Sequence, residues 1–69
     1  MRTQSRSKIA QYKGIQGRAW AVWSVWSFED FTQTYEVEMV WGGNGVVFRA
    51  ETMEEVEEYM TKVMAKRVW

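Results

Sequence analysis

Cysteine, histidine, proline and leucine are all absent from this chain of 69 residues. Without cysteine the chain forms no disulfide, and without cysteine or histidine it lacks the usual ligands of zinc and other transition metals. The same absences remove the groups that most often act as or activate a catalytic nucleophile. We therefore expect no metal, no cofactor and no enzymatic activity, and we interpret the chain as a small binding protein.

Long apolar runs are also missing. No segment approaches the roughly 20 apolar residues that a membrane-spanning helix needs. The first seven residues are polar and are not followed directly by the apolar stretch of a secretion signal. These features predict a cytoplasmic protein without a membrane partner.

The lack of leucine leaves nine valines, two isoleucines, five methionines and the aromatic residues to form the core. Such a bias toward β-branched and aromatic residues favours strands. A chain of this length folds as one domain and buries only about 60% of the surface that its unfolded form exposes. With neither a disulfide nor a metal to reinforce the core, we expect a homo-oligomer, a dimer or larger.

The net charge is zero, but the charges are separated along the chain. Residues 1–18 carry five basic residues and no acid, whereas residues 29–58 carry all nine acids against Arg49 alone. We expect residues 1–7 to form a basic, flexible N-terminal arm and residues 8–69 to form the single domain. The arm suits an anionic partner, although a solvated terminus that happens to be basic has the same composition.

Strand-like patterns fill the middle of the chain. Residues 18–28 alternate with apolar side chains on both faces, so this strand is either central and covered twice or lies at a subunit interface. Residues 32–41 show the clean alternation of a half-buried antiparallel strand. Residues 42–45 supply the glycines of a tight hairpin, and residues 46–50 return as the next strand. Residues 8–16 fit a short helical turn or an edge strand, and the sequence leaves this open.

A helix is predicted to begin after Thr52, with Glu55 completing a capping box. Apolar residues recur at helical spacing and should be buried against the sheet: Met53, Val56, Met60, Val63 and Met64. The basic residues Lys62, Lys66 and Arg67 are expected at the end of this helix, which suits its dipole. The predicted fold is therefore α+β: an antiparallel β-meander of three or four strands, followed by one C-terminal α-helix packed on the sheet.

Five tryptophans are present, three of them within residues 19–26. Nucleic-acid bases stack on such side chains, and an arginine nearby can bind the phosphate. The alternative is that the same tryptophans fill the core or a subunit interface. We expect self-association through residues 18–28, with Trp23 as a large interface side chain. The predicted ligand-binding residues are Arg18, Trp20, Trp23, Trp26 and Arg49.

Two functions follow from these features. The first is a small accessory protein, of the kind encoded by phages or mobile elements, that sequesters a nucleotide-type ligand or a short single strand. The second is an inhibitor that binds a host protein through an acidic face which mimics nucleic acid. That face would consist of Glu36, Glu38, Glu54, Glu55, Glu57 and Glu58.

Overall fold

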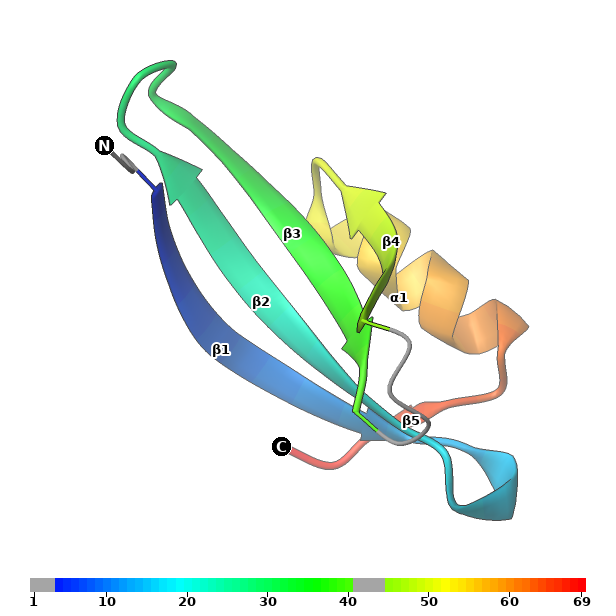
Figure 1. Ribbon diagram of the computed structural model, residues 1–69. Coiled ribbons are helices and arrows are strands. Elements are labelled where there is room, and N and C mark those ends of the chain that lie inside the picture. The colour runs from blue at the N-terminus through cyan, green and yellow to red at the C-terminus, as the bar shows by residue number, and fades with distance from the viewer. Residues whose placement is uncertain (1–3, 41–44) are drawn as a thin grey trace.

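The protein is an antiparallel five-stranded sheet with one helix packed on it (Figure 1). The structure, a computed structural model, describes residues 4–40 and 45–69. The strands lie in the order β4-β3-β2-β1-β5, which is a meander from β1 to β4 with a short fifth strand on the outside. The elements are β1 (Gln4–Lys13), the 3-10 turn η1 (Ile15–Gly17), β2 (Ala19–Ser27), β3 (Thr32–Met39), β4 (Gly45–Ala50), α1 (Met53–Lys62) and β5 (Lys66–Arg67).

The predicted α+β class, with a meander and a helix on the sheet, is confirmed, and the sheet is larger than the sequence indicates. Residues 4–7, expected to belong to a flexible arm, are the start of β1 and pair in register with Ser27 to Ser24 of β2. Their side chains are exposed, so no apolar alternation marks them as a strand. The rest of the expected arm, residues 1–3, lies outside the described residues. So does the expected hairpin turn, apart from Gly45 with a φ of +70°.

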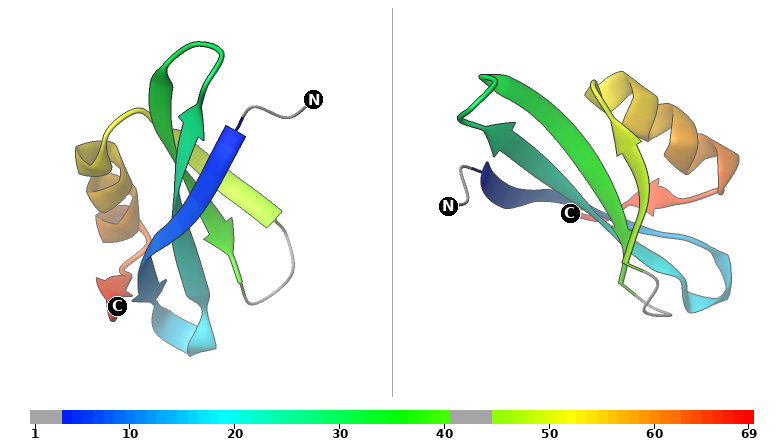
Figure 2. Two further views of the ribbon diagram at one scale, coloured as in Figure 1. Left: turned by 90° about the vertical axis from the view of Figure 1, so that its left-hand side faces the viewer. Right: turned by 45° about the horizontal axis from the view of Figure 1, so that its top comes forward.

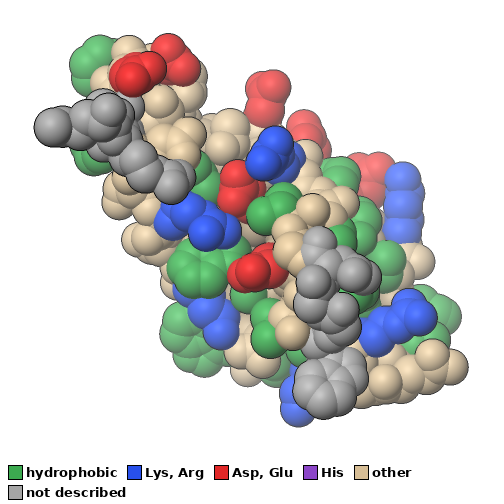
Figure 3. All heavy atoms as spheres, viewed as in Figure 1, with side chains coloured by type: hydrophobic (Ala, Val, Ile, Leu, Met, Phe, Trp, Pro, Cys, Tyr) green, Lys and Arg blue, Asp and Glu red, His purple; other side chains and the backbone are tan. Residues whose placement is uncertain are grey.

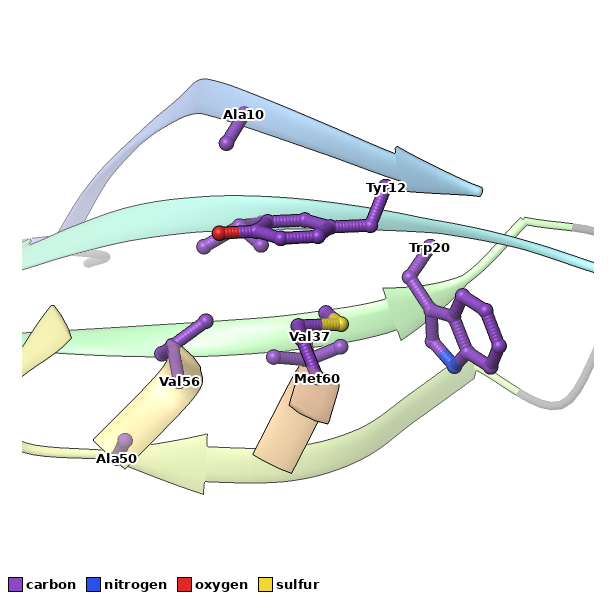
Figure 4. Packing of buried hydrophobic residues seen from close by; sticks show 8 residues of the cluster. Ala10, Tyr12, Trp20, Val37, Ala50, Val56 and Met60 are labelled. Atoms are coloured by element: carbon purple, nitrogen blue, oxygen red, sulfur yellow. The ribbon is translucent and has the colours of Figure 1, made fainter. Parts of the chain in front are cut away.

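Strand β2 is the middle strand of the sheet, and its two faces have different surroundings. One face carries Trp20 and Val22, which belong to the same buried cluster as Val56 and Met60 of α1. Figures 1 and 2 show α1 lying on one side of the sheet. The buried cluster on this side draws on every long element of the fold (Figure 4). Its fully and nearly fully buried members are Ala10, Tyr12, Trp20, Val22, Val37, Ala50, Val56 and Met60.

Helix α1 begins as its sequence predicts. The Thr52 side chain accepts a hydrogen bond from the Glu55 amide at 3.3 Å, which confirms this half of the predicted capping box. The Glu55 carboxylate accepts a hydrogen bond from the amide of Glu51 at 3.4 Å, one residue before the Thr52 amide that the box would use. Acidic residues occupy the first turn and Lys62 the last, an order that suits the helix dipole. The expected burial of Val56 and Met60 is confirmed. The expected extent of the helix is wrong at its end: α1 stops at Lys62, Met64 is 63% exposed with a φ of +58°, and Lys66 and Arg67 form β5, where they pair with β1.

Trp20 is the largest fully buried side chain and is only 1% exposed. A Cβ atom on Gly14 would lie 2.6 Å from its Cζ3 and 2.8 Å from its Cη2, so only glycine leaves room for the indole there. The backbone of Gly14 is extended, with a φ of −116°, and is open to any residue. The requirement for glycine is therefore one of space beside the Trp20 ring.

Replacing Gly14 with alanine should lower the free energy of unfolding by about 1–3 kcal/mol, the usual cost of overpacking a core. Trp20→Phe removes the ring atoms that the new methyl group would meet. In that background the cost of Gly14→Ala should fall well below its cost in the wild-type chain. Urea denaturation of the two single variants and the double variant measures this coupling, and additive effects would contradict the proposed clash.

Candidate functional site

The face of the sheet opposite α1, here called the open face, is not covered by the helix. Trp23 lies near its centre, opposite Lys8 on β1 and Glu36 on β3. Ala21 and Val25 flank Trp23 on β2 and are buried. Figure 3 views the molecule from this side and shows acidic, basic and hydrophobic side chains side by side. The open face is thus a polar surface built around one indole ring.

The Trp23 side chain is held by two charged groups. Its Nε1 donates a hydrogen bond to Oε1 of Glu38 at 3.0 Å. The guanidinium carbon of Arg6 lies 4.6 Å from the centroid of the indole ring, a cation–π arrangement. The ring is therefore fixed in orientation, with a cation already placed over it.

Glu36 joins the cations of the open face. Its carboxylate lies 3.2 Å from an Nη atom of Arg6 and 3.3 Å from Nε of Arg49. The side chain of Glu36 is 17% exposed, whereas that of Arg49 is 74% exposed. One carboxylate therefore forms ion pairs with two arginines, and the three side chains together keep a net positive charge.

A basic edge borders the open face along β1 and β5. Lys13 of β1 lies directly opposite Lys66 of β5, and both are exposed. Like charges at directly opposite positions destabilise a sheet. Among the described residues, none of the cations at this edge forms a salt bridge with an Asp or Glu side chain. The basic edge consists of Lys8, Lys13, Arg18, Lys66 and Arg67.

Trp69 adds an aromatic ring to the basic edge. The Lys8 ammonium lies 5.4 Å from the centroid of this ring and also donates a hydrogen bond to Oε1 of Gln11 at 3.0 Å. The backbone amide of Gln11 donates to the Trp69 main-chain oxygen, which holds this residue against β1. Two tryptophans, Trp23 and Trp69, are therefore each paired with a cation of β1.

The five predicted ligand-binding residues do not form one cluster. Trp23 and Arg49 share the open face, on either side of Glu36. Trp20 is buried in the core, which is the alternative that the sequence left open. Trp26 lies on the Trp20 face at the far end of β2, edge-to-face with Phe28 at 6.2 Å. Arg18 is exposed at the opposite end, just before β2.

Sequence reasoning missed Arg6, Lys8, Lys13, Lys66 and Trp69 as parts of this surface. The spacing of Arg6 and Lys8 places them on one face of a strand, and this signal could have been found if residues 4–8 had been treated as a strand. No local pattern could have placed Lys66 beside Lys13, because 52 residues separate them (66 minus 13, less one).

The expected acidic face is divided between two sides of the sheet. Glu36 and Glu38 lie on the open face and are engaged by arginines and by Trp23. The four glutamates of α1 are exposed on the other side, where the helix packs. The strand and helix glutamates therefore do not act together as one surface.

A small hollow lies on the helix side of the protein, away from Trp23. It has a volume of about 140 Å³ and is lined by Phe48, Tyr59 and Lys62 together with Glu55 and Glu58. A second hollow, of about 310 Å³, is lined by Thr34, Arg49, Ala50, Glu51 and Glu55, so the predicted ligand-binding residue Arg49 borders it together with two glutamates. The open face, in contrast, is a surface that an extended ligand can lie along.

Comparison with known proteins gave no matching family model, no matching curated protein and no matching solved structure. Within residues 4–40 and 45–69, no helix has the length and apolar character needed to cross a membrane. In the same part of the chain, no three potential metal-ligating side chains come together.

Arg6 is the residue on which the order of the open face depends, because it contacts both Trp23 and Glu36. Replacing it with methionine keeps the apolar stem and removes the charge, and should cost about 0.5–1.5 kcal/mol of stability. Arg49→Met is the matched control, since Arg49 binds the same carboxylate but is far more exposed, and it should cost less. Equal losses in chemical denaturation of the two variants would argue against a special role for Arg6.

Proposed function

We propose that this protein binds short single-stranded nucleic acid along the open face and the basic edge. The observation that carries this proposal is the cross-strand pair of Lys13 and Lys66. Two lysines placed directly opposite each other repel when the protein is alone, and a phosphate between them turns that repulsion into attraction. The lysine pair therefore destabilises the free protein and stabilises its complex with nucleic acid.

The aromatic residues near these cations suit the same ligand. Bases stack on aromatic side chains for about 1–3 kcal/mol each, with little dependence on sequence. Trp69 is exposed beside Lys8, and Trp23 is half-buried beneath Arg6. A strand running along β1 would meet a ring and a cation at both places.

The shape of the surface favours a strand over a single nucleotide. The cations of the basic edge are spread along β1, the residue between η1 and β2, and β5, and they do not surround one point. Most acids lie at the β2–β3 turn and on α1. The two on the open face, Glu36 and Glu38, already contact Arg6, Arg49 and Trp23. The separation of charge leaves a basic field where the strand would lie.

The test removes the lysine pair and measures binding of a labelled single-stranded oligonucleotide by fluorescence anisotropy at several salt concentrations. Lys13→Gln combined with Lys66→Gln should weaken binding about tenfold or more and lower the salt slope by about 0.7, because the pair binds one phosphate and each phosphate contact contributes roughly 0.7. The same variant should unfold at an equal or higher temperature, since the repulsion is gone. Lys62→Gln, a single charge removed from the end of α1, should leave binding nearly unchanged.

Other outcomes would redirect the proposal. If single strands fail to bind at low salt while mononucleotides or cyclic dinucleotides quench tryptophan fluorescence, the ligand is a small nucleotide. If no nucleic acid or nucleotide binds and the protein instead forms a salt-sensitive complex with a basic protein, the exposed glutamates of α1 become the functional surface. Either result would contradict the single-strand proposal.

A further inference from the structure

The turn between β2 and β3 carries two exposed aromatic rings. Phe28 and Phe31 are 53% and 76% exposed, and they flank Glu29 and Asp30. Trp26 lies edge-to-face with Phe28 at the base of the turn. We call Phe28, Glu29, Asp30 and Phe31 the aromatic tip, an apolar and acidic surface at one end of the molecule.

Phe31 adopts a backbone conformation that a bulky residue rarely takes. Its φ is +53°, in the left-handed region where glycine and asparagine are the usual residues of such a turn. The ring is 76% exposed, so little burial within the chain offsets this strain. A strained and exposed aromatic residue points to a contact outside the chain.

The opposite end of the molecule has the complementary chemistry. Ile15, in η1, is 55% exposed and lies between Lys13 and Arg18, which are also exposed. Strand β2 runs from this turn to the aromatic tip, so the two lie at opposite ends of a molecule whose longest extent is 39 Å (Figure 1). We call Lys13, Ile15 and Arg18 the basic turn.

We propose that copies of this protein associate head to tail, with the aromatic tip of one copy on the basic turn of the next. Phe31 and Phe28 would cover Ile15, while Glu29 and Asp30 would face Lys13 and Arg18. The partner is a second copy because the same chain carries both halves of a matched apolar and charged pair. Since the contact is heterologous, each added copy leaves one tip and one turn free, and the assembly grows into a chain or closes into a ring.

This surface shares only Arg18 and Phe28 with the interface that the sequence suggested over residues 18–28. Strand β2 is hydrogen-bonded on both edges, by β1 and β3, and one of its faces packs toward α1. The exposed apolar residues Ile15, Phe28 and Phe31 lie beyond the two ends of β2 and not on its faces. Lys13 and Arg18 belong to both the basic edge and the basic turn, so association is measured with the protein alone, in the absence of nucleic acid.

Two variants block one end each without removing a cation of the basic edge. Phe31→Gly removes the aromatic ring at the tip, and Ile15→Asp places a negative charge in the basic turn. In sedimentation velocity over a wide range of protein concentration, the wild-type chain should form concentration-dependent oligomers that weaken as salt is raised. Each variant alone should associate about tenfold or more weakly. Val47→Asp, which places the same charge on exposed β4 away from both turns, should associate like the wild type.

Mixing the two variants gives the decisive measurement. Phe31→Gly keeps an intact basic turn and Ile15→Asp keeps an intact tip, so an equimolar mixture should form a one-to-one dimer and nothing larger. Phe31→Gly should also melt at an equal or higher temperature, because glycine adopts a positive φ without strain.

Three results would overturn the proposal. They are a wild-type chain that stays monomeric at every concentration, a mixture that forms no heterodimer, and a clear drop in the melting temperature of Phe31→Gly, which would show that the ring stabilises the fold itself. Oligonucleotide binding by Phe31→Gly should match the wild type. Failure of head-to-tail association and failure of nucleic-acid binding are therefore distinguishable.

Discussion

The packing of α1 against one face of β2 is the contact on which the rest of the structure depends. Val56 and Met60 close over the sheet where Trp20 and Val22 lie, and this cluster is the core of the described chain. One helix of ten residues covers only one face of a five-stranded sheet. Strand β2 is apolar on both faces, and α1 covers the face that carries Trp20. Trp23 therefore lies on the uncovered face.

On the open face, charged side chains contact the Trp23 ring, and no second apolar layer packs on it. Arg6 lies over the indole, Glu38 accepts its N–H, and Glu36 holds Arg6. Exposed ion pairs contribute little to stability on their own, so the arrangement orders the surface more than it strengthens the fold. An ordered surface of rings and cations is what a binding role requires, since less freedom is lost when a ligand arrives.

Local patterns predicted the parts of the fold in which neighbours in sequence determine the structure. The Thr52 cap, the buried stripe of α1 and the strand over β3 follow from short-range spacing. Strand β1 escaped prediction at its start because residues 4–8 are polar on both faces. Strand β5 was not predicted, because two residues are too few to show an alternating pattern. Among the predicted site residues, Trp20 and Trp23 look alike in sequence, and only their places on opposite faces of β2 separate core from surface.

The sequence by itself determined the α+β class, the helix with its cap, the alternation of the central strands and the overall separation of acids from bases. Tertiary structure decided which face of β2 the helix covers, that Arg6 lies over Trp23, and that Lys66 returns to lie opposite Lys13. The physical reason is that a strand's period of two defines two faces without saying which is buried when both are apolar. Contacts between residues far apart in the chain depend on strand order and register, and these are properties of the whole fold.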